Sequence, residues 1–168
     1  MSFPNIPDNE IEVIPYHLTE ILIITDMGGL QHFQMGVVFA GAIPFNDFMP
    51  ASIAKTLSVL QGEKPVLIVT EGTAKLDNHK YKSLFHIKAK MIPYDEVEAY
   101  VGHAPGGVCP FGVNEGVAVY LDESLRKFDT VYPAAGNGHT AVKLTLQELE
   151  AAAGAEGWVD VCKEPEGE

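Results

Sequence analysis

The chain has 168 residues, of which 46% are hydrophobic and 20% are charged. This length and composition are typical of a globular protein and exclude a disordered, collagen-like or coiled-coil chain. The net charge of −12 repels phosphate groups, which argues against an extended, non-specific grip on DNA or RNA. We therefore expect one domain over residues 1–168, with an acidic tail over residues 160–168.

The sequence lacks the features that would indicate a membrane span, a secretory signal or a metal site. The longest apolar runs fall well short of the ~20 residues that span a bilayer. No Lys or Arg precedes Lys55, although a secretory signal begins with basic residues. We expect a cytoplasmic protein with no membrane partner. Two separate cysteines and six histidines without metal-ligand spacing predict neither a disulfide, a metal nor another cofactor.

Short runs rich in β-branched residues follow one another along the chain and predict strands. They cover residues 20–25, 36–39, 53–60, 65–70, 116–121, 130–134 and 140–144. Glycine-containing segments at 61–64 and 136–139 supply the positive φ angles that hairpin turns need.

Helix signals are fewer and occur singly between these runs. They predict helices over residues 78–84, over 95–101 before Gly102, and over 145–153 before Gly154. The last helix opens with a capping box, in which Thr145 and Glu148 satisfy each other's backbone groups. The pattern predicts an α+β fold: a mixed, mostly antiparallel, barrel-like sheet with flanking helices.

Residues 64–90 are rich in positive charge. They contain six lysines and two acidic residues, which gives a local charge of +4. Such a run is usually a solvated face, but Lys80 and Lys82 are candidates for a small phosphate-binding surface.

Lys55 is the most informative single residue. In a strand over residues 53–60, alternation places Lys55 on the same face as Ile53, Leu57 and Val59. An ammonium group on an apolar face is costly unless it is paired or hydrogen-bonded, so an inward lysine is a candidate functional residue. A helix over residues 51–60 or an edge strand would instead leave the amine in solvent.

Residues 106–112 form a loop rich in glycine and proline, Gly106-Gly107-Val108-Cys109-Pro110-Phe111-Gly112. Free amides in such a loop can stabilise an oxyanion, but the composition is equally typical of a tight connection. Cys109 with His103 could form the nucleophile and base of a thiol hydrolase. A buried, unreactive thiol is the commoner situation.

Two further candidates lie near the ends of predicted strands. Asp122 follows an apolar run, where its carboxylate could pair with the buried lysine or cap the turn at Asp122-Glu123-Ser124. His139 ends the turn that begins at Gly136, where it could bind a substrate or serve only the turn.

Taken in order, these motifs resemble the YbaK/EbsC family of prolyl-tRNA editing domains over about residues 50–150. The motifs are Ala54-Lys55-Thr56-Leu57, Gly102 with Gly106 to Gly112, Val119-Tyr120-Leu121-Asp122-Glu123, and Ala135-Gly136 with His139. The resemblance implies a compact mixed β-barrel with surrounding helices. It also implies a trans-acting deacylase that hydrolyses the ester joining a wrong amino acid to proline-specific tRNA.

The resemblance further assigns roles to residues. Lys55 matches the family's essential lysine, and we expect it to stabilise the carbonyl oxygen together with the amides of Gly106 and Gly107. The expected substrate-binding residues are Val108, Cys109, Pro110, Phe111, Asp122, Gly136 and His139. The expected partners are the acceptor end of aminoacyl-tRNA, with phosphate contacts from Lys80 and Lys82, and prolyl-tRNA synthetase.

Two other functions remain open at this point. One is a module of the same fold that binds an amino acid, a nucleotide or a tRNA end without catalysis. The other is a thiol-dependent hydrolase acting through Cys109. The amino acid removed, and whether water or a group of the substrate attacks the ester, also stay open.

Overall fold

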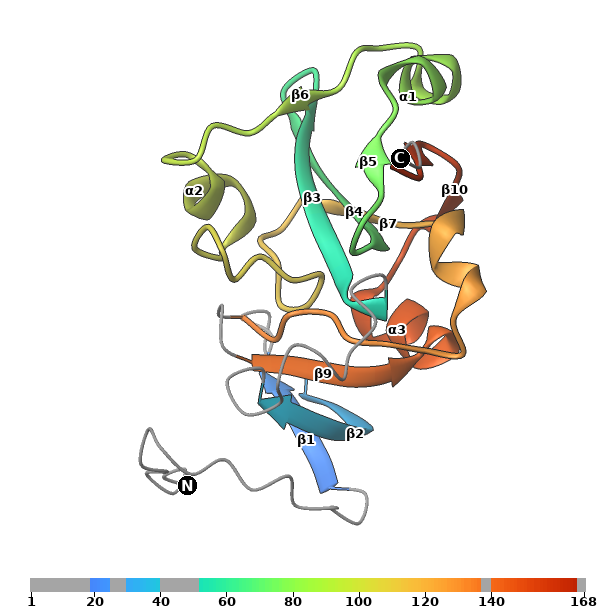
Figure 1. Ribbon diagram of the computed structural model, residues 1–168. Coiled ribbons are helices and arrows are strands. Elements are labelled where there is room, and N and C mark those ends of the chain that lie inside the picture. Colours follow the sequence, from blue (N-terminus) through green and yellow to red (C-terminus); the bar gives the residue numbers. More distant parts are fainter. Residues whose placement is uncertain (1–18, 25–29, 40–51, 137–139, 166–168) are drawn as a thin grey trace.

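The computed structural model of the chain describes residues 19–24, 30–39, 52–136 and 140–165 (Figure 1). Its strands form three sheets. The first has the order β1 (Thr19–Ile24), β2 (Leu30–Phe39), β9 (Thr140–Thr145), β8 (Thr130–Val131). The second has the order β10 (Gly157–Val159), β7 (Ala118–Asp122), β4 (Lys64–Glu71), β3 (Ala54–Gln61), β6 (Lys90–Met91). The third pairs β5 (Lys75–Leu76) with β11 (Cys162–Lys163).

The strand pairing is mostly antiparallel, as predicted. Only β7 pairs in parallel among the described strands, with β4 on one side and β10 on the other. The predicted barrel-like closure is wrong, because these strands form open sheets and no closed barrel. A barrel needs strands long enough to pair continuously around it, whereas the five-stranded sheet ends in the two-residue strand β6 and the three-residue strand β10.

A two-residue turn joins β3 to β4 and fixes their alignment. Gly62 has φ +69°, and Gln61 pairs directly with Lys64. From there the register runs without a break to Lys55 opposite Thr70. The hairpin predicted over residues 61–64 is therefore confirmed.

The core lies on both faces of the five-stranded sheet, because its central strand β4 is buried from residue 66 to residue 71. We call the two groups of buried apolar side chains the first and second clusters. The first includes Ala54, Leu67, Val69, Cys109, Phe111 and Leu121. The second consists of Val59, Val66, Ile68, Ala74, Tyr81, Val159, Val161 and Cys162.

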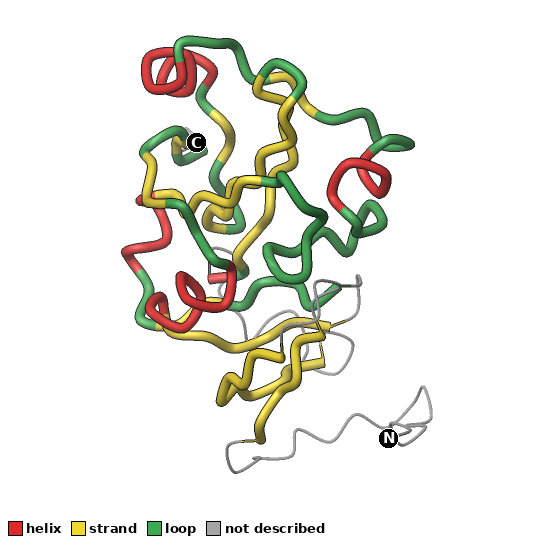
Figure 2. The backbone as a smooth tube through the Cα atoms, turned by 180° about the vertical axis from the view of Figure 1, so that it is seen from behind, coloured by secondary structure: helices red, strands yellow, loops and turns green. Residues whose placement is uncertain are grey.

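Three α-helices lie around the strands (Figure 2). They are α1 (Asn78–Phe85), α2 (Val97–Val101) and α3 (Leu146–Ala153). All three were predicted, and the capping box of α3 is present with both of its hydrogen bonds. A 3-10 helix over Glu123–Lys127 was missed, because its five residues are too few for a periodic pattern.

The seven predicted strands are present, with some changes in length. β2 begins six residues earlier than predicted, whereas β8 is limited to Thr130–Val131. Pro133 has no N–H to donate, which ends the ladder, although its carbonyl still accepts from the Val142 N–H at 2.9 Å. Among the helices of the described residues, none is long and apolar enough to cross a bilayer.

Gly102 is a position where the fold requires glycine. It ends α2 with φ +93°, and an added Cβ would lie 2.7 Å from Asn114 Oδ1. We expect Gly102→Ala to lower the free energy of unfolding by about 1–3 kcal/mol. Gly154 also has a positive φ but open space around it, so Gly154→Ala is the matched control in a urea titration. Equal effects of the two substitutions would contradict the steric part of this argument.

Candidate active site

Lys55 lies on β3 with its side chain half-buried on the face of the second cluster. Leu57 and Val59, two and four residues further on, pack in that cluster. The Lys55 amine donates a hydrogen bond of 2.5 Å to the carbonyl oxygen of Ala74, a fully buried residue. Among the described residues the amine has no carboxylate partner, so a positive charge is held on a neutral group.

Three polar residues form a row across one end of the sheet. Thr70 on β4 is directly opposite Lys55, and Val69 pairs with Leu121, so Asp122 comes next to Thr70. Thr70 and Asp122 are 0% and 1% exposed. The Thr70 hydroxyl lies 3.0 Å from the Ser124 hydroxyl, which also accepts from the Glu71 N–H at 3.3 Å. Thr70 was not singled out from the sequence, although the two-residue turn at 62–63 would have placed it beside Lys55.

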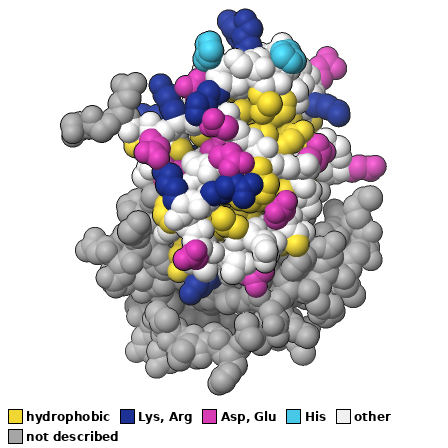
Figure 3. Space-filling view, turned by 90° about the vertical axis from the view of Figure 1, so that its right-hand side faces the viewer, with side chains coloured by type: hydrophobic (Ala, Val, Ile, Leu, Met, Phe, Trp, Pro, Cys, Tyr) yellow, Lys and Arg dark blue, Asp and Glu magenta, His cyan; other side chains and the backbone are white. Residues whose placement is uncertain are grey.

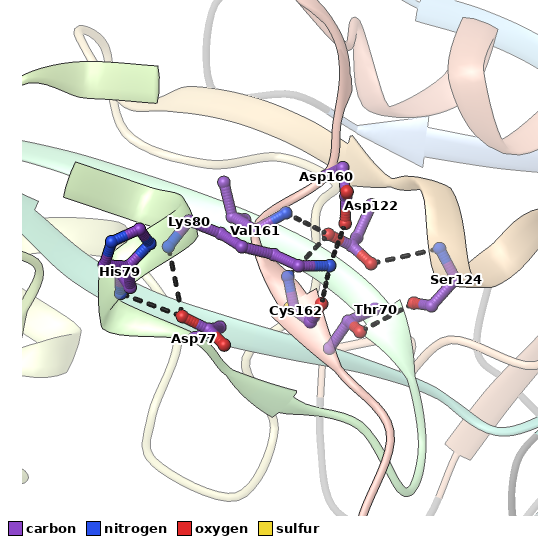
Figure 4. Close-up of polar contacts among 9 residues, drawn as sticks. All are labelled: Thr70, Asp77, His79, Lys80, Asp122, Ser124, Asp160, Val161 and Cys162. Atoms are coloured by element: carbon purple, nitrogen blue, oxygen red, sulfur yellow. Dashed lines mark hydrogen bonds and ion pairs between the residues drawn. The ribbon is translucent and has the colours of Figure 1, made fainter. Parts of the chain in front are cut away.

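Asp122 accepts hydrogen bonds from three backbone N–H groups (Figure 4). One carboxylate oxygen accepts from Ser124 at 3.0 Å, which caps the 3-10 helix. The other accepts from Val161 at 2.9 Å and Cys162 at 3.1 Å. Of the two roles considered for Asp122, the structure shows the cap, together with a tie to the C-terminal segment.

Cys162 lies beside this row, and the groups of the row affect the pKa of its thiol. Burial raises the pKa of the Cys162 thiol to about 12, an effect opposed by the Thr70 hydroxyl and the positive charge of Lys55, and increased by Asp122. Cys162 is thus close to Asp122, whose carboxylate accepts its N–H, and to Thr70. Its contribution was missed because the sequence around it is an acidic tail without a periodic pattern.

Lys80 and Lys82, both on α1, have different surroundings. The Lys80 amine contacts Asp160 at 2.6 Å and donates to the Cys162 carbonyl at 3.0 Å, which ties α1 to the C-terminal segment (Figure 4). The hydrogen bond to Asp160 raises the pKa of Lys80. Lys82 is exposed. Lys80 thus has a structural partner, whereas Lys82 is open to solvent.

The glycines of the predicted oxyanion loop form a turn. The Gly107 N–H donates to the Ala104 carbonyl at 3.0 Å, and Pro105 and Gly106 occupy the two central positions, with φ +89° at Gly106. Proline followed by a glycine of positive φ is typical of a type II turn. The hydrogen bond to Ala104 occupies the Gly107 amide, as expected of a tight connection.

Cys109 and His103 lie close together, but their hydrogen bonds disfavour a nucleophile. Cys109 Sγ is 3.5 Å from His103 Nε2, which itself lies 2.6 Å from the Phe111 carbonyl oxygen. Because a carbonyl only accepts, Nε2 carries the proton and cannot take one from the thiol. Burial raises the pKa of Cys109 to about 11, although backbone contacts with Phe111 and Gly136 oppose it.

The apolar side chains of the loop and those next to Lys55 on β3 belong to different clusters. Cys109 and Phe111 are buried in the first cluster and Val108 packs against it, whereas Lys55 lies on the face of the second. Pro110 is buried too. Gly136 contacts Cys109, so two of the predicted pieces do meet. His139 lies outside the described residues. Within the described ranges, no three His, Cys, Asp or Glu side chains gather as metal ligands would.

Comparison with known proteins bears on this site. A family model described as an aminoacyl-tRNA editing domain matches residues 42–152. An uncharacterized protein of Bacillus subtilis (strain 168), YwhH, is 46% identical over 113 residues, which cover 67% of this chain and 72% of that protein. A protein of Enterococcus faecalis provisionally named Cys-tRNA(Pro)/Cys-tRNA(Cys) deacylase EbsC is 32% identical over 100 residues, covering 58% of this chain and 60% of that one.

More distant relatives agree with this match. The proline–tRNA ligase of B. subtilis is 28% identical over 74 residues, which are 44% of this chain and 13% of the ligase. A crystal structure described as a provisional trans-editing enzyme for prolyl-tRNA synthetase has a TM-score of 0.67 and 26% identity, and the match covers 77% of this chain and 87% of that one. The family match spans more than half of the chain and includes Lys55, the loop and Asp122. This chain therefore belongs to the aminoacyl-tRNA editing domain family.

Proposed function

We propose that the chain is a trans-acting deacylase that hydrolyses the ester of mischarged proline tRNA, with Lys55 stabilising the charge that develops on the ester carbonyl. The proposal also includes a cytoplasmic location and prolyl-tRNA synthetase as a partner. Its support is family membership together with one observation. The Lys55 amine is held on the Ala74 carbonyl and has no carboxylate partner in the part of the chain that the structure describes, so its charge is available to an anion.

The chemistry follows from the position of that amine. Attack on an ester places negative charge on the carbonyl oxygen, and a fixed cation in a partly desolvated position stabilises that charge more than water does. The Lys55 amine can exchange its bond to the Ala74 carbonyl for one to the substrate, because an ammonium group has three donors. The attacking group is water or a group of the substrate, because neither cysteine is activated.

The loop contributes less than Lys55 to the electrostatic part of this proposal. The Gly107 amide is already bonded within the turn, and the loop packs against the first cluster. We therefore assign the main electrostatic contribution to Lys55, and to the loop residues Gly106, Pro110 and Phe111 a role in packing on the other face of the sheet. A role for Gly136 and His139 in substrate binding remains part of this proposal.

Deacylation of a panel of mischarged tRNAs tests the function. The protein is incubated with proline tRNA carrying cysteine, alanine or serine, and with correctly charged cysteine tRNA. The proposal expects at least one mischarged proline tRNA to lose its amino acid faster than in buffer. If every ester is stable while the tRNA still binds, the non-catalytic module is the correct function.

Replacing Cys109 tests the thiol-dependent alternative. With its pKa raised to about 11, the thiol is ionised in only about one molecule in a thousand at pH 8. We expect Cys109→Ala to keep its deacylation rate within about twofold. We also expect the native thiol to react with iodoacetamide slowly at pH 8 and faster as the pH rises toward 11. Loss of activity as large as that caused by Lys55→Ala would support the thiol mechanism instead.

A further inference from the structure

Glu71 is a buried carboxylate that the proposed mechanism does not use. Acidic side chains usually lie at the surface, and on the face shown in Figure 3 they are interspersed with Lys and Arg side chains. Among the described residues, the buried acidic ones are Glu71, which is 2% exposed, and Asp122. The three N–H groups that Asp122 accepts from explain its burial. An apolar side chain at position 71 would serve packing alone better, because burying an ionised carboxylate is costly.

Glu71 holds the turn that follows β4. Its Oε1 atom accepts a hydrogen bond of 2.6 Å from the Thr73 hydroxyl. Its backbone carbonyl accepts from the Ala74 N–H at 3.3 Å, which closes the turn over residues 71–74. Glu71 therefore fixes this turn twice, through its side chain and through its backbone.

The 3-10 helix provides two further contacts to Glu71. The Ser124 hydroxyl accepts from the Glu71 N–H at 3.3 Å, and Lys127 Nζ lies 3.8 Å from Glu71 Oε2. Lys127 is shared with Glu164 and its side chain is 43% exposed, so solvent weakens this ion pair. Of the two side-chain contacts of the carboxylate, the one with Thr73 is much the shorter.

The turn ends at the residue that holds Lys55. Ala74 is fully buried in the second cluster, and its carbonyl accepts from the Lys55 amine at 2.5 Å. Because the amine ends a flexible four-carbon chain, its direction depends on where this carbonyl is fixed. Glu71 pairs with Ala54 of the first cluster, which places Glu71 and Lys55 on opposite faces of the sheet. Glu71 therefore reaches the amine only through the turn.

We propose that Glu71 is the positioning residue for Lys55. Its hydrogen bond to Thr73 fixes the turn over residues 71–74, and the Ala74 carbonyl at the end of that turn orients the amine. The inference rests on the proposed function, because it takes the Lys55 amine as the group that stabilises the ester carbonyl. A carboxylate in direct contact would orient the amine but neutralise its charge. A carboxylate that acts through a neutral carbonyl leaves the charge available to the substrate.

Exchange of the Lys55 ammonium hydrogens with water tests this positioning directly. An ammonium group held on a buried carbonyl exchanges slowly enough to give a proton–nitrogen NMR signal from Nζ, and Lys55→Arg identifies the signal by its disappearance. We expect the signal to be broadened or lost in Glu71→Ala and in Thr73→Val, because each removes one partner of the hydrogen bond. We expect Glu71→Gln to keep it, since an amide oxygen still accepts from the Thr73 hydroxyl.

Thr145→Val is the matched control. The Thr145 hydroxyl also contacts a glutamate, Glu148, at 3.1 Å, and it caps α3. Its replacement therefore lowers stability without changing the turn over residues 71–74, and we expect the Lys55 signal and the deacylation rate to stay as in the wild type. An equal loss of signal in this control would overturn the inference. A signal that Thr73→Val leaves unchanged, or that is already absent from the wild type, would overturn it too.

The deacylation rate connects the position of the amine to catalysis. We expect Glu71→Ala and Thr73→Val to lower the maximal single-turnover rate by roughly 10- to 100-fold, since a displacement of about 1 Å can cost about 100-fold. The protein concentration that gives half of this rate should stay the same, because no group that binds tRNA is removed. A wild-type rate in a variant that has lost the Lys55 signal would overturn the inference.

Two outcomes need separate treatment. If Glu71→Ala does not fold, the comparison of Thr73→Val with Thr145→Val decides, because Thr73 is only half-buried and valine has nearly the same shape as threonine. The NMR measurement needs no tRNA, so it does not depend on turnover. A wild type whose Lys55 signal responds as expected but that deacylates no ester would refute the proposed function and leave the control of Lys55 by Glu71 in place.

Discussion

Lys55→Arg is expected to lower the rate of deacylation by at least about 100-fold, the usual cost of removing one donor to a developing oxyanion. The substitution keeps the charge but replaces a compact ammonium group with a wide, planar guanidinium group. The amine lies 2.5 Å from a buried carbonyl on a half-apolar face, where the larger group does not fit in the same place. The measurement is the first-order rate of ester loss from mischarged tRNA under single-turnover conditions.

Two further variants separate the effect of the charge at position 55 from that of a Lys-to-Arg change in general. Lys55→Met keeps most of the aliphatic side chain and removes the charge, so we expect the same loss of activity from a protein that still folds. Lys64→Arg makes the same chemical change at an exposed position and should leave the rate unchanged. Near-normal turnover by Lys55→Arg would mean that a closely fitted ammonium group is not required.

Asp122→Ala is expected to have the largest effect on stability, about 3–5 kcal/mol in the free energy of unfolding. The carboxylate is 1% exposed and satisfies three backbone N–H groups, two of them in a buried segment. Its removal leaves these donors without partners, and each unsatisfied buried group is costly. Chemical denaturation followed by circular dichroism measures the change.

Asp160→Ala provides the matched control for this substitution. Asp160 precedes Val161, but its side chain is 62% exposed and its partner Lys80 is 40% exposed. Exposed ion pairs contribute about 0–1 kcal/mol, so the control should change stability by no more than that. Comparable effects at positions 122 and 160 would contradict the role given to the buried hydrogen bonds.

The parts of the fold that sequence predicted well are those with strong local signals. Short apolar runs rich in β-branched residues located β3 and β4, and Gly62 located the turn that joins them. The same two-residue turn determines that Thr70 is opposite Lys55, so this half of the polar row follows from the amino-acid sequence alone. The strands β5, β6 and β11 have two residues each, too few for a periodic pattern to show.

The candidate site was predicted less completely, for reasons of distance along the chain. The position of Lys55 on an apolar face followed from alternation, but its partner Ala74 is 19 residues away in an irregular segment. The cluster in which the Gly106–Phe111 loop packs could not be predicted, because no local pattern says which face of a sheet a loop covers. The proximity of His103 to Cys109 could not be predicted either, and only the hydrogen bond from His103 to the Phe111 carbonyl shows which ring nitrogen carries the hydrogen.

The hydrogen bonds of Asp122 affect where the C-terminal boundary of an expressed editing domain should be placed. The family match ends at residue 152, but residues 157–163 supply the outer neighbour of β7 and two donors to the Asp122 carboxylate. A fragment that ended at residue 152 would expose the edge of β7, which favours aggregation. It would also leave the buried Asp122 carboxylate without two of its hydrogen-bond donors. Expression of the isolated editing unit therefore requires about ten residues more than homology alone would include.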